Sequence, residues 1–589
     1  MTLSRCLFAG LLLFVAAPLQ AAEPQDPLRL IPDKANLVVK VEKPRQFIES
    51  LLNQEIAKEA EHLDIVRQLL DSAQARRIFE FIAYAERDLG VKWPELLDKL
   101  AGGGIALGTT IQSDDDSPVL LVIQGTDEAL AKKFVDRASA LFEAIAGGPD
   151  AKDKVTKENY KKLETLHFGS GLHACRIESA ILVSNKLETL KAGIDQHWSN
   201  QTKGAVTNRS LLDVPNLQKA RKLLPANPLV WLWYDLAYLK TIPGAKDVLT
   251  SPRDNIVFTF IAAGILDIVR RSDFVAAGFY ETKEGFNISL RMPAGRDGMA
   301  DDVELHLPRN AKNPGSLPLL EPQGVLFSHS FYLDLNTLYA KRDKVMSGQS
   351  AKDFDAGVKQ VSRVLVGTSL EKLFSQMGPH HRLVAVQRPP TAGYTIEPQV
   401  RIPAFAYIAS MRDPKFAKSI ETLIRGGMAL GGGLGGFTTK LFEGKHGDVS
   451  YFGYRFPENG KFPDDPQGIR FNFTPTAAAV GDQFIVASTQ EFCLELIDYL
   501  KKEDRSKLIT HNMQMKGFAE GVGAYLNYSP ELLLAQTILN QAISEADAKK
   551  QVDQLLTYIN KLGSVQIGTD YTSNEFHFDI RWRFKTKQN

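Results

Sequence analysis

The sequence predicts an α+β protein made of two tandem, sequence-related halves, each with a mainly antiparallel sheet and packed helices. Two observations support this prediction. A strand, turn, strand and helix module occurs twice, over residues 172–194 and 476–497, and other strand and helix patterns recur around it in the same order. Neither half shows the repeated strand–helix–strand rhythm of a parallel sheet, which makes the class α+β.

The repeated module has readable turns and helix starts. In the second copy Gly481-Asp482 separates two apolar strands, which is a strong hairpin signal, and Ile177-Glu178 stands at the matching place in the first copy. Ser488 with Glu491 three residues later is typical of a capping box, and Ser184 offers a hydroxyl at the equivalent position. We expect both helices to begin at these serines.

The elements before the module also recur. Residues 37–41 read as a strand, and Pro44 then opens a helix with an apolar face. Residues 325–331 are the matching strand of the second half, again followed by helical spacing. The strands that begin at Pro118 and Pro403 are 285 residues apart, and each leads to a helix capped by an aspartate.

The elements after the module recur as well. Residues 230–234 and 524–528 read as matching strands. The last pair, 278–291 and 568–581, has an offset of 290 residues, identical Gly, Thr, Phe and Arg positions, and the period-two alternation of antiparallel strands. Several ordered anchors of this kind favour a tandem duplication. The predicted parts are a signal peptide over 1–21, a first α+β repeat over 22–312 and a second over 313–589, joined by the Pro, Asn and Gly-rich stretch 308–318.

Composition and net charge limit the classes of protein to which this chain can belong. The chain has 589 residues, of which 44% are hydrophobic, so it can bury a sizeable core. Its 70 basic and 69 acidic residues give a formal net charge of +1. Such a balanced chain has no overall field that would attract nucleic acid, so we expect no nucleic-acid partner.

The N-terminus is typical of an export signal. Arg5 supplies a positive charge, residues 7–17 are apolar, and residues 18–22 offer small side chains for cleavage. The apolar run is too short to span a bilayer, so no transmembrane segment is expected in the mature chain. The sequence therefore predicts a secreted protein, periplasmic or extracellular. Its two remaining cysteines, Cys175 and Cys493, fit buried free thiols better than a disulfide framework.

The layout resembles the secreted bacterial proteins grouped as domain-of-unknown-function family 3352. The resemblance lies in the signal peptide, in the opening Ile31-Pro-Asp-Lys-Ala-Asn-Leu-Val-Val-Lys-Val41, and in the module at 476–497. It implies export and this architecture for most of the mature chain. It implies no activity and assigns no functional residue.

Motifs for catalysis and metal binding are missing from the sequence. Ser369 and Lys372 have the Ser-x-x-Lys spacing of serine acyl-enzymes, but the companion Ser-Asp-Asn and Lys-Thr-Gly elements are absent, and helix capping explains the serine better. No His-Glu-x-x-His, Cys-x-x-Cys or Gly-x-Ser-x-Gly motif occurs. We expect no catalytic, cofactor or metal residues and no enzyme activity.

Two apolar segments are candidates for a contact surface. Residues 256–266 are apolar all round and fit a buried helix better than an exposed one. The glycine-rich stretch 425–437 fits an apolar-lined loop, because a phosphate-binding loop would follow a strand and open a helix. The candidate contact residues are Ile256, Phe258, Phe260, Ile261, Met428, Leu430, Leu434 and Phe437.

These observations favour an exported, non-catalytic protein that binds a protein, an envelope component or an apolar ligand where its two halves join. A carrier of lipids or other hydrophobic ligands is the first alternative, since both candidate segments are apolar. A hydrolase without a recognisable motif is the second alternative.

Overall fold

The computed structural model describes residues 25–111, 117–146, 155–169, 171–201, 209–249, 254, 256–307, 315–365, 367–389, 391–435, 437–460, 462, 465–504, 511–527 and 530–585. The predicted signal peptide and most of the predicted linker at 308–318 lie outside these residues.

The chain divides into two compact units. The first comprises Met1–Lys246 and Ser272–Pro293, and the second comprises Asp247–Arg271 and Ala294–Asn589. This boundary differs from the predicted one at 312/313 because α11 (Ile256–Arg271) packs within the second unit. Phe260 packs in a cluster with Leu305 and Leu338, and Arg271 donates a hydrogen bond to the carbonyl oxygen of Gly295.

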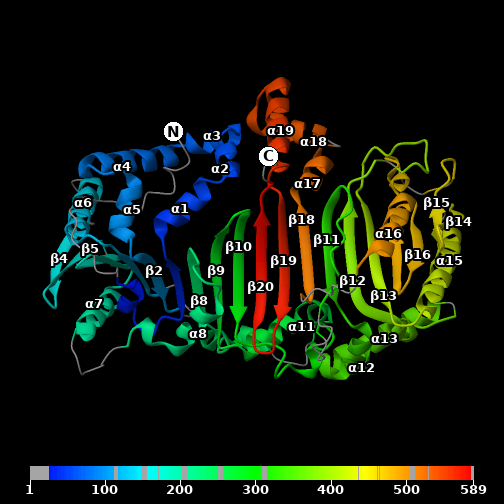
Figure 1. Ribbon diagram of the computed structural model, residues 1–589, viewed down its shortest axis with the longest axis horizontal. Helices are drawn as coiled ribbons and strands as arrows, with labels where there is room; N and C mark the ends of the chain where they lie inside the picture. Colours follow the sequence, from blue (N-terminus) through cyan, green and yellow to red (C-terminus); the bar gives the residue numbers. More distant parts are fainter. Residues whose placement is uncertain are drawn as a thin grey trace. The chain divides into compact units, whose positions relative to one another are not determined.

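The first unit contains one antiparallel sheet whose strands follow the order β10–β9–β8–β1–β2–β3–β7–β6–β5–β4 (Figure 1). The strands are β1 (Leu37–Val41), β2 (Gly104–Thr109), β3 (Val119–Gln124), β4 (Val155–Tyr160), β5 (Leu163–Phe168), β6 (Leu172–Ile177), β7 (Ala180–Ser184), β8 (Val230–Asp235), β9 (Phe274–Thr282) and β10 (Gly285–Met292).

Helices pack on both faces of this sheet. One face forms a closed core with η2 (Pro27–Leu30), α7 (Leu187–Gln201), η3 (Leu211–Asp213) and α8 (Pro215–Leu223), around the fully buried Trp231 and Trp233. On the other face α1 (Pro44–Leu52), α4 (Ala73–Leu89), α5 (Trp93–Ala101) and α6 (Glu128–Ala146) pack over β3 and β7, and α2 (Glu55–Ala60) and α3 (Asp64–Leu70) stand between α1 and α4 in the chain. The helices α9 (Leu236–Leu239) and α10 (Pro243–Leu249) follow β8.

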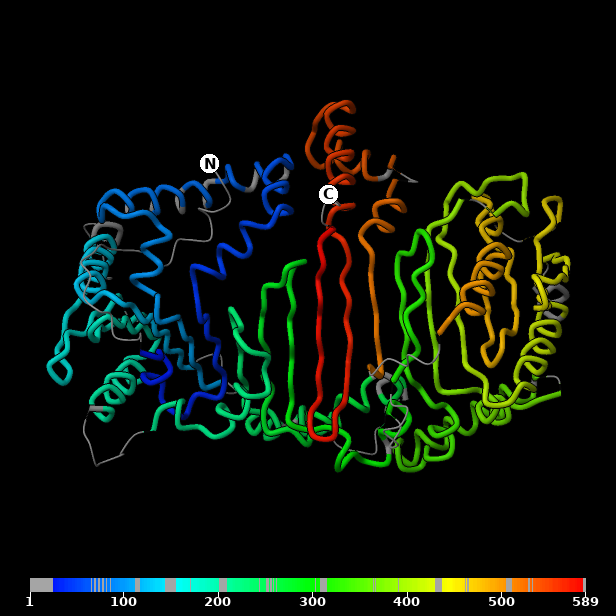
Figure 2. The backbone as a smooth tube through the Cα atoms, viewed as in Figure 1, coloured from blue at the N-terminus to red at the C-terminus, as the bar shows by residue number. Residues whose placement is uncertain are grey.

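The second unit also contains one antiparallel sheet, in the order β20–β19–β18–β11–β12–β13–β17–β16–β15–β14. Figure 2 shows β19 and β20 as a long hairpin beside β18. The strands are β11 (Val325–Tyr332), β12 (Met377–Val386), β13 (Ala404–Met411), β14 (Lys440–His446), β15 (Val449–Arg455), β16 (Thr476–Val480), β17 (Gln483–Ala487), β18 (Met513–Phe518), β19 (Ser564–Tyr571) and β20 (Phe576–Arg583).

On one face of the second sheet, a single helix closes the core over β12, β13, β16 and β17. Phe492, Leu496 and Leu500 of α16 (Gln490–Lys502) pack on Val384, Ala406 and their neighbours. On the opposite face α14 (Leu370–Gln376) and α15 (Lys415–Gly435) cover β15, β16 and β17. The other helices of this unit are η4 (Asp301–Val303), α12 (Leu335–Val345), α13 (Gly348–Val364), η5 (Ile469–Asn472), α17 (Ala519–Leu526), α18 (Pro530–Gln541) and α19 (Glu545–Ile559).

The α+β class is therefore confirmed. The two strand orders correspond strand by strand, since each strand of the first sheet matches the strand numbered ten higher in the second. This correspondence is what a duplication requires, but the descent of both units from one copied ancestor stays a prediction.

The repeated module is present with small shifts. Gly481, with φ of +59°, makes the turn between β16 and β17, as expected. In the first copy the turn lies one residue later than predicted, and Glu178 adopts the positive φ of 53°. Thr489 rather than Ser488 caps α16, because the Ser488 hydroxyl accepts the backbone N–H of Phe405 instead.

Candidate functional site

The second sheet has an apolar face that helices cover only in part. Because directly opposed residues of an antiparallel sheet point to the same side, the strand register defines three rows of side chains from β20 to β13. The rows are Trp582–Val565–Gly517–Phe327–Ala385–Phe405, Ile580–Ile567–Met515–His329–Leu383–Tyr407 and Phe578–Thr569–Met513–Phe331–His381–Ala409. We call these three rows the open face.

The open face carries no Lys, Arg, Asp or Glu in any of its rows. Several of its large side chains are well exposed, with fractions of 53% for Phe405, 39% for Leu383 and 37% for Trp582. Most of the others are half-buried, and Thr569, His381 and Ala409 of the third row are buried. On β17 the middle row continues to Val486, where α14 and α15 cover it. The first two rows of the open face are thus the least covered part of a longer apolar surface.

A ladder of stacked rings crosses the centre of the open face. The ring centroids of His329 and Phe331 are 4.7 Å apart, those of Phe331 and His381 5.2 Å, and those of His381 and Tyr407 5.9 Å. Phe327 lies beyond His329 at 6.1 Å. Such offset aromatic contacts hold side chains in fixed positions and present flat apolar surface.

The two histidines of the ladder have different hydrogen bonds. Nε2 of His381 lies 2.8 Å from the carbonyl oxygen of Leu333, so it donates, and Nδ1 accepts the hydroxyl of Tyr407 at 2.6 Å. Burial lowers the pKa of His381 and raises the pKa of Tyr407 to about 12. In contrast, Nε2 of His329 is buried without a hydrogen-bond partner among the described residues, and burial lowers the pKa of His329.

The first sheet has a comparable apolar face. Its middle row consists of half-buried side chains and contains no charged residue over seven strands. The row is Leu290–Ala277–Leu232–Val39–Leu107–Leu121–Val183. Leu121 and Val183 pack against the helices of this unit, whereas Ile288 in the next row is 40% exposed. The large residues of this face are mainly aliphatic.

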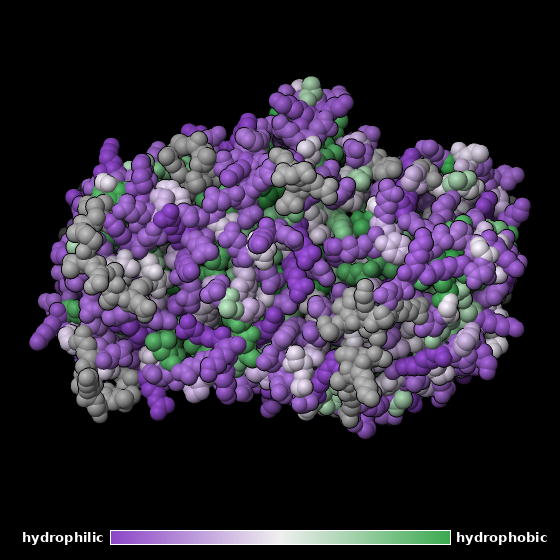
Figure 3. All heavy atoms as spheres, viewed as in Figure 1, coloured by the Kyte–Doolittle hydropathy of each residue, from purple (hydrophilic) through white to green (hydrophobic). Residues whose placement is uncertain are grey.

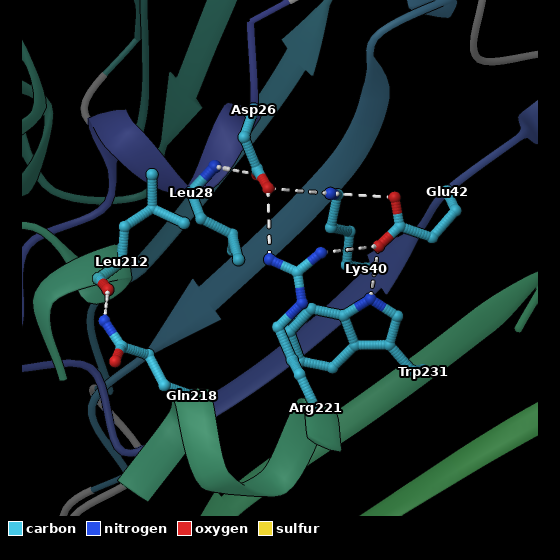
Figure 4. A network of polar contacts seen from close by, with 8 residues as sticks. All are labelled: Asp26, Leu28, Lys40, Glu42, Leu212, Gln218, Arg221 and Trp231. Carbon is cyan, nitrogen blue, oxygen red and sulfur yellow. Dashed lines mark hydrogen bonds and ion pairs between the residues drawn. The ribbon is translucent and has the colours of Figure 1, made fainter. Parts of the chain in front are cut away.

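A polar pocket of about 620 Å³ opens in the first unit. Figure 4 shows the ion pairs beside it, which join η2, β1, α8 and β8. Lys40, only 3% exposed, lies 3.1 Å from Asp26 and 2.8 Å from Glu42. Arg221 pairs with the same two carboxylates and lies over the ring of Trp231, whose indole N–H donates to Glu42 at 2.7 Å. Two cations face two carboxylates, so the network is balanced in charge and links these elements.

The candidate residues named from the sequence do not form one site. Phe260 packs among η4, α12 and α13, whereas Met428 packs on β15–β17 and Phe437 contacts Phe456 and Phe462. The side chains of the other five candidates, Ile256, Phe258, Ile261, Leu430 and Leu434, lie outside the described residues. The helix α11 is not fully buried, since Val257 is 65% exposed and Ile265 is 45% exposed.

The glycine-rich stretch is helical up to Gly435, so the prediction of a loop over 425–437 was wrong. Ile420, Leu423, Ile424 and Met428 lie at helical spacing and pack on the sheet. Arg425 pairs with Glu421 one turn earlier and with Glu443 of β14. Tertiary packing of this apolar side outweighs the low helix propensity of glycine.

Other sequence candidates have structural explanations. The Ser369 hydroxyl accepts the backbone N–H of Lys372 at 3.2 Å and caps α14. Cys175 and Cys493 are buried free thiols. Across the described ranges, no group of three or more His, Cys, Asp or Glu side chains is placed to hold a metal ion.

The surface seen in Figure 3 is mostly hydrophilic, with hydrophobic residues in small separate groups. None of the helices that the structure describes has the length and hydropathy needed to cross a bilayer.

No protein family and no curated protein matches the sequence. Among solved structures, it is similar to crystal form I of TP0453, with a TM-score of 0.23 and 9% identity, covering 48% of this chain and 83% of that chain. A similarity this small carries no functional argument. The resemblance to domain-of-unknown-function family 3352 stays a prediction.

Proposed function

We propose that this is an exported, non-catalytic protein that binds an apolar, chain-shaped ligand, such as the acyl chain of an envelope lipid, on its open face. The observation that carries the proposal is the set of three uncharged rows that cross six strands. Contiguous apolar surface of this kind marks a binding site more often than it remains bare. Export to the periplasm or the extracellular space is part of the proposal and rests on the N-terminal sequence.

The energetic argument starts from the exposed side chains. Full burial of one large apolar side chain is worth about 1.5–3 kcal/mol relative to full exposure. Phe405 and Leu383 are well exposed while the face is bare, so a large part of this burial free energy is not gained. An apolar ligand lying over them would recover it without desolvating any charge.

The dimensions and chemistry of the rows favour an acyl chain. Neighbouring strands lie about 4.8 Å apart, so six strands span about 24 Å. One leaflet of a bilayer has a hydrocarbon thickness of about 15 Å, half of the full core, so a lipid chain fits along a row. Protein interfaces usually combine an apolar centre with a polar rim and Arg anchors, which these rows do not have. Met513 and Met515 add flexible, polarisable surface that adapts to a ligand.

Native mass spectrometry of the gently purified mature protein tests the proposal directly. We expect a co-purified lipid, and saturable binding of a fluorescent fatty acid by the delipidated protein. Leu383→Asp and Phe405→Asp should each weaken that binding about tenfold or more, since they place a carboxylate under the ligand. The matched control is Leu539→Asp, because Leu539 is 81% exposed on α18 and lies outside the open face.

A second measurement locates the ligand. Trp582 belongs to the open face, and the other four tryptophans, at 93, 198, 231 and 233, belong to the first unit. A brominated fatty acid should quench the fluorescence of Trp582, and Trp582→Phe should remove that part of the quenching while binding persists. Equal binding by the Leu383→Asp and Leu539→Asp proteins would refute the proposal. Capture of a folded protein in place of lipid would point to a protein partner instead.

A further inference from the structure

We propose that His329 makes the open face acid-sensitive, so that protonation of its ring expels the bound apolar chain. This inference rests on the proposed function and adds its regulation. His329 stands in the middle row, with Met515 on one side and Leu383 on the other. A chain lying along that row covers the imidazole directly.

The surroundings of His329 favour the neutral form of its imidazole ring. Along its own strand it lies between Phe327 and Phe331, with centroid distances of 6.1 Å and 4.7 Å. Its buried Nε2 has no hydrogen-bond partner among the described residues. Protonation of both ring nitrogens would create a cation whose N–H at Nε2 has no acceptor among the described residues, which is costly in apolar surroundings.

The groups on the same face of β18, of β12 and of β13, which lies beyond β12, do not neutralise such a cation. In the middle and third rows of the open face, β18 presents Met515 and Met513, and β13 presents Tyr407 and Ala409. From β12 comes His381, whose two ring nitrogens are already engaged by Leu333 and Tyr407. The charged pair Asp334 and Arg412 is joined by a hydrogen bond of 2.6 Å and acts on the pKa of His381.

The sign of the effect follows from linkage. The ligand removes water from the His329 ring, so the neutral ring binds the ligand better than the protonated ring does. Affinity is therefore full above the pKa of His329 in the ligand-free protein and falls as the pH drops through that pKa. By reciprocity, bound ligand lowers the pKa of His329 by the same coupling free energy. A coupling of one pKa unit corresponds to a change of about tenfold in affinity.

The experiment measures binding of a fluorescent fatty acid to the full mature chain between about pH 7.5 and about pH 4.5, within the range where histidines titrate. Wild-type affinity should fall about tenfold or more over this range, while far-ultraviolet circular dichroism shows the protein still folded. His329→Phe should bind at the higher pH and lose most of the pH dependence. His446→Gln is the control, because His446 lies on β14, away from the open face, beside Asp498.

A second readout needs no variant. Histidine ring signals of the wild-type protein, followed by NMR over the same pH range, should show one histidine whose pKa falls when the fatty acid is bound. Binding that persists unchanged at low pH, or an equal pH dependence in His329→Phe, would overturn the inference and leave the proposed function standing. Absence of binding at the higher pH would overturn both.

Discussion

The guanidinium of Arg382 donates hydrogen bonds to both carboxylate oxygens of Glu503, and the two side chains are only 1% and 7% exposed. The same guanidinium donates to the side-chain oxygen of Gln483. This buried fork joins β12 and β17 to the residue that follows α16. It lies on the face of the second sheet opposite the open face.

Arg382→Met should therefore destabilise the second unit. Removing one partner of a buried ion pair leaves the other charge uncompensated, which costs about 3–5 kcal/mol. Urea unfolding followed by circular dichroism measures the loss. Arg382→Lys should recover only part of it, because an ammonium cannot reproduce the bidentate geometry. A loss below about 1 kcal/mol for Arg382→Met would show that the pair contributes little.

Acid should lower the free energy of unfolding, because the buried His380 ring becomes protonated. Burial lowers its pKa from the ordinary value of 6.5 to about 4, so the folded protein favours the neutral ring. Stability is then fully present above about pH 6.5 and is lost as the pH falls toward about 4, by about 3 kcal/mol. The measurement is the free energy of unfolding of wild type and His380→Gln across this range. The wild type should lose more than the variant, and parallel curves would contradict the prediction.

The two cysteines should be inert in the native protein. Burial raises the pKa of the thiols of Cys175 and Cys493 to about 12, so almost no reactive thiolate is present at neutral pH. A disulfide reagent such as Ellman's reagent should modify neither residue until denaturant is added, and then both. Rapid modification of the native chain would mean that these sites open easily.

The glycines of α15 offer a stabilising change. A Cβ atom added at Gly426 or Gly427 would meet nothing within 4 Å, so alanine fits at both positions. Replacing a glycine in a helix interior by alanine gains about 0.5–1 kcal/mol. The double variant Gly426→Ala, Gly427→Ala should raise the free energy of unfolding by about 1–2 kcal/mol and leave fatty-acid binding unchanged. Destabilisation would indicate that the segment needs glycine for another conformation.

Local signals in the sequence predict much of this fold. The Gly481 hairpin and the aspartate-capped helices after Asp127 and Asp413 are present where their turn and cap residues predict them. Each depends on chemistry within a few residues. The predicted strand at 524–528 is wrong, because residues 524–526 belong to α17, and the strand that matches β8 is β18. Short apolar runs fit both helix and strand, and packing decides between them.

The open face could not be read from the sequence for a different reason. Alternation along Phe327, His329 and Phe331 shows that these side chains share one side of β11. Whether a helix covers that side depends on where the helices pack, and α14 and α15 pack in one cluster with β15, β16 and β17. Coverage is a tertiary property. The apolar composition of α11, in contrast, can be read from the sequence alone.

The order of strands also constrains how the protein is made. Strand β11 pairs with β12, which follows soon after it, and with β18, which the ribosome adds far downstream. Until Met513 and its neighbours emerge, one edge of β11 has unsatisfied backbone groups beside aromatic side chains, which favours pairing with other chains. One edge of β1 likewise stays unpaired until β8 has been synthesised. We expect the growing chain to depend on holding chaperones, and truncation before β18 to yield aggregates.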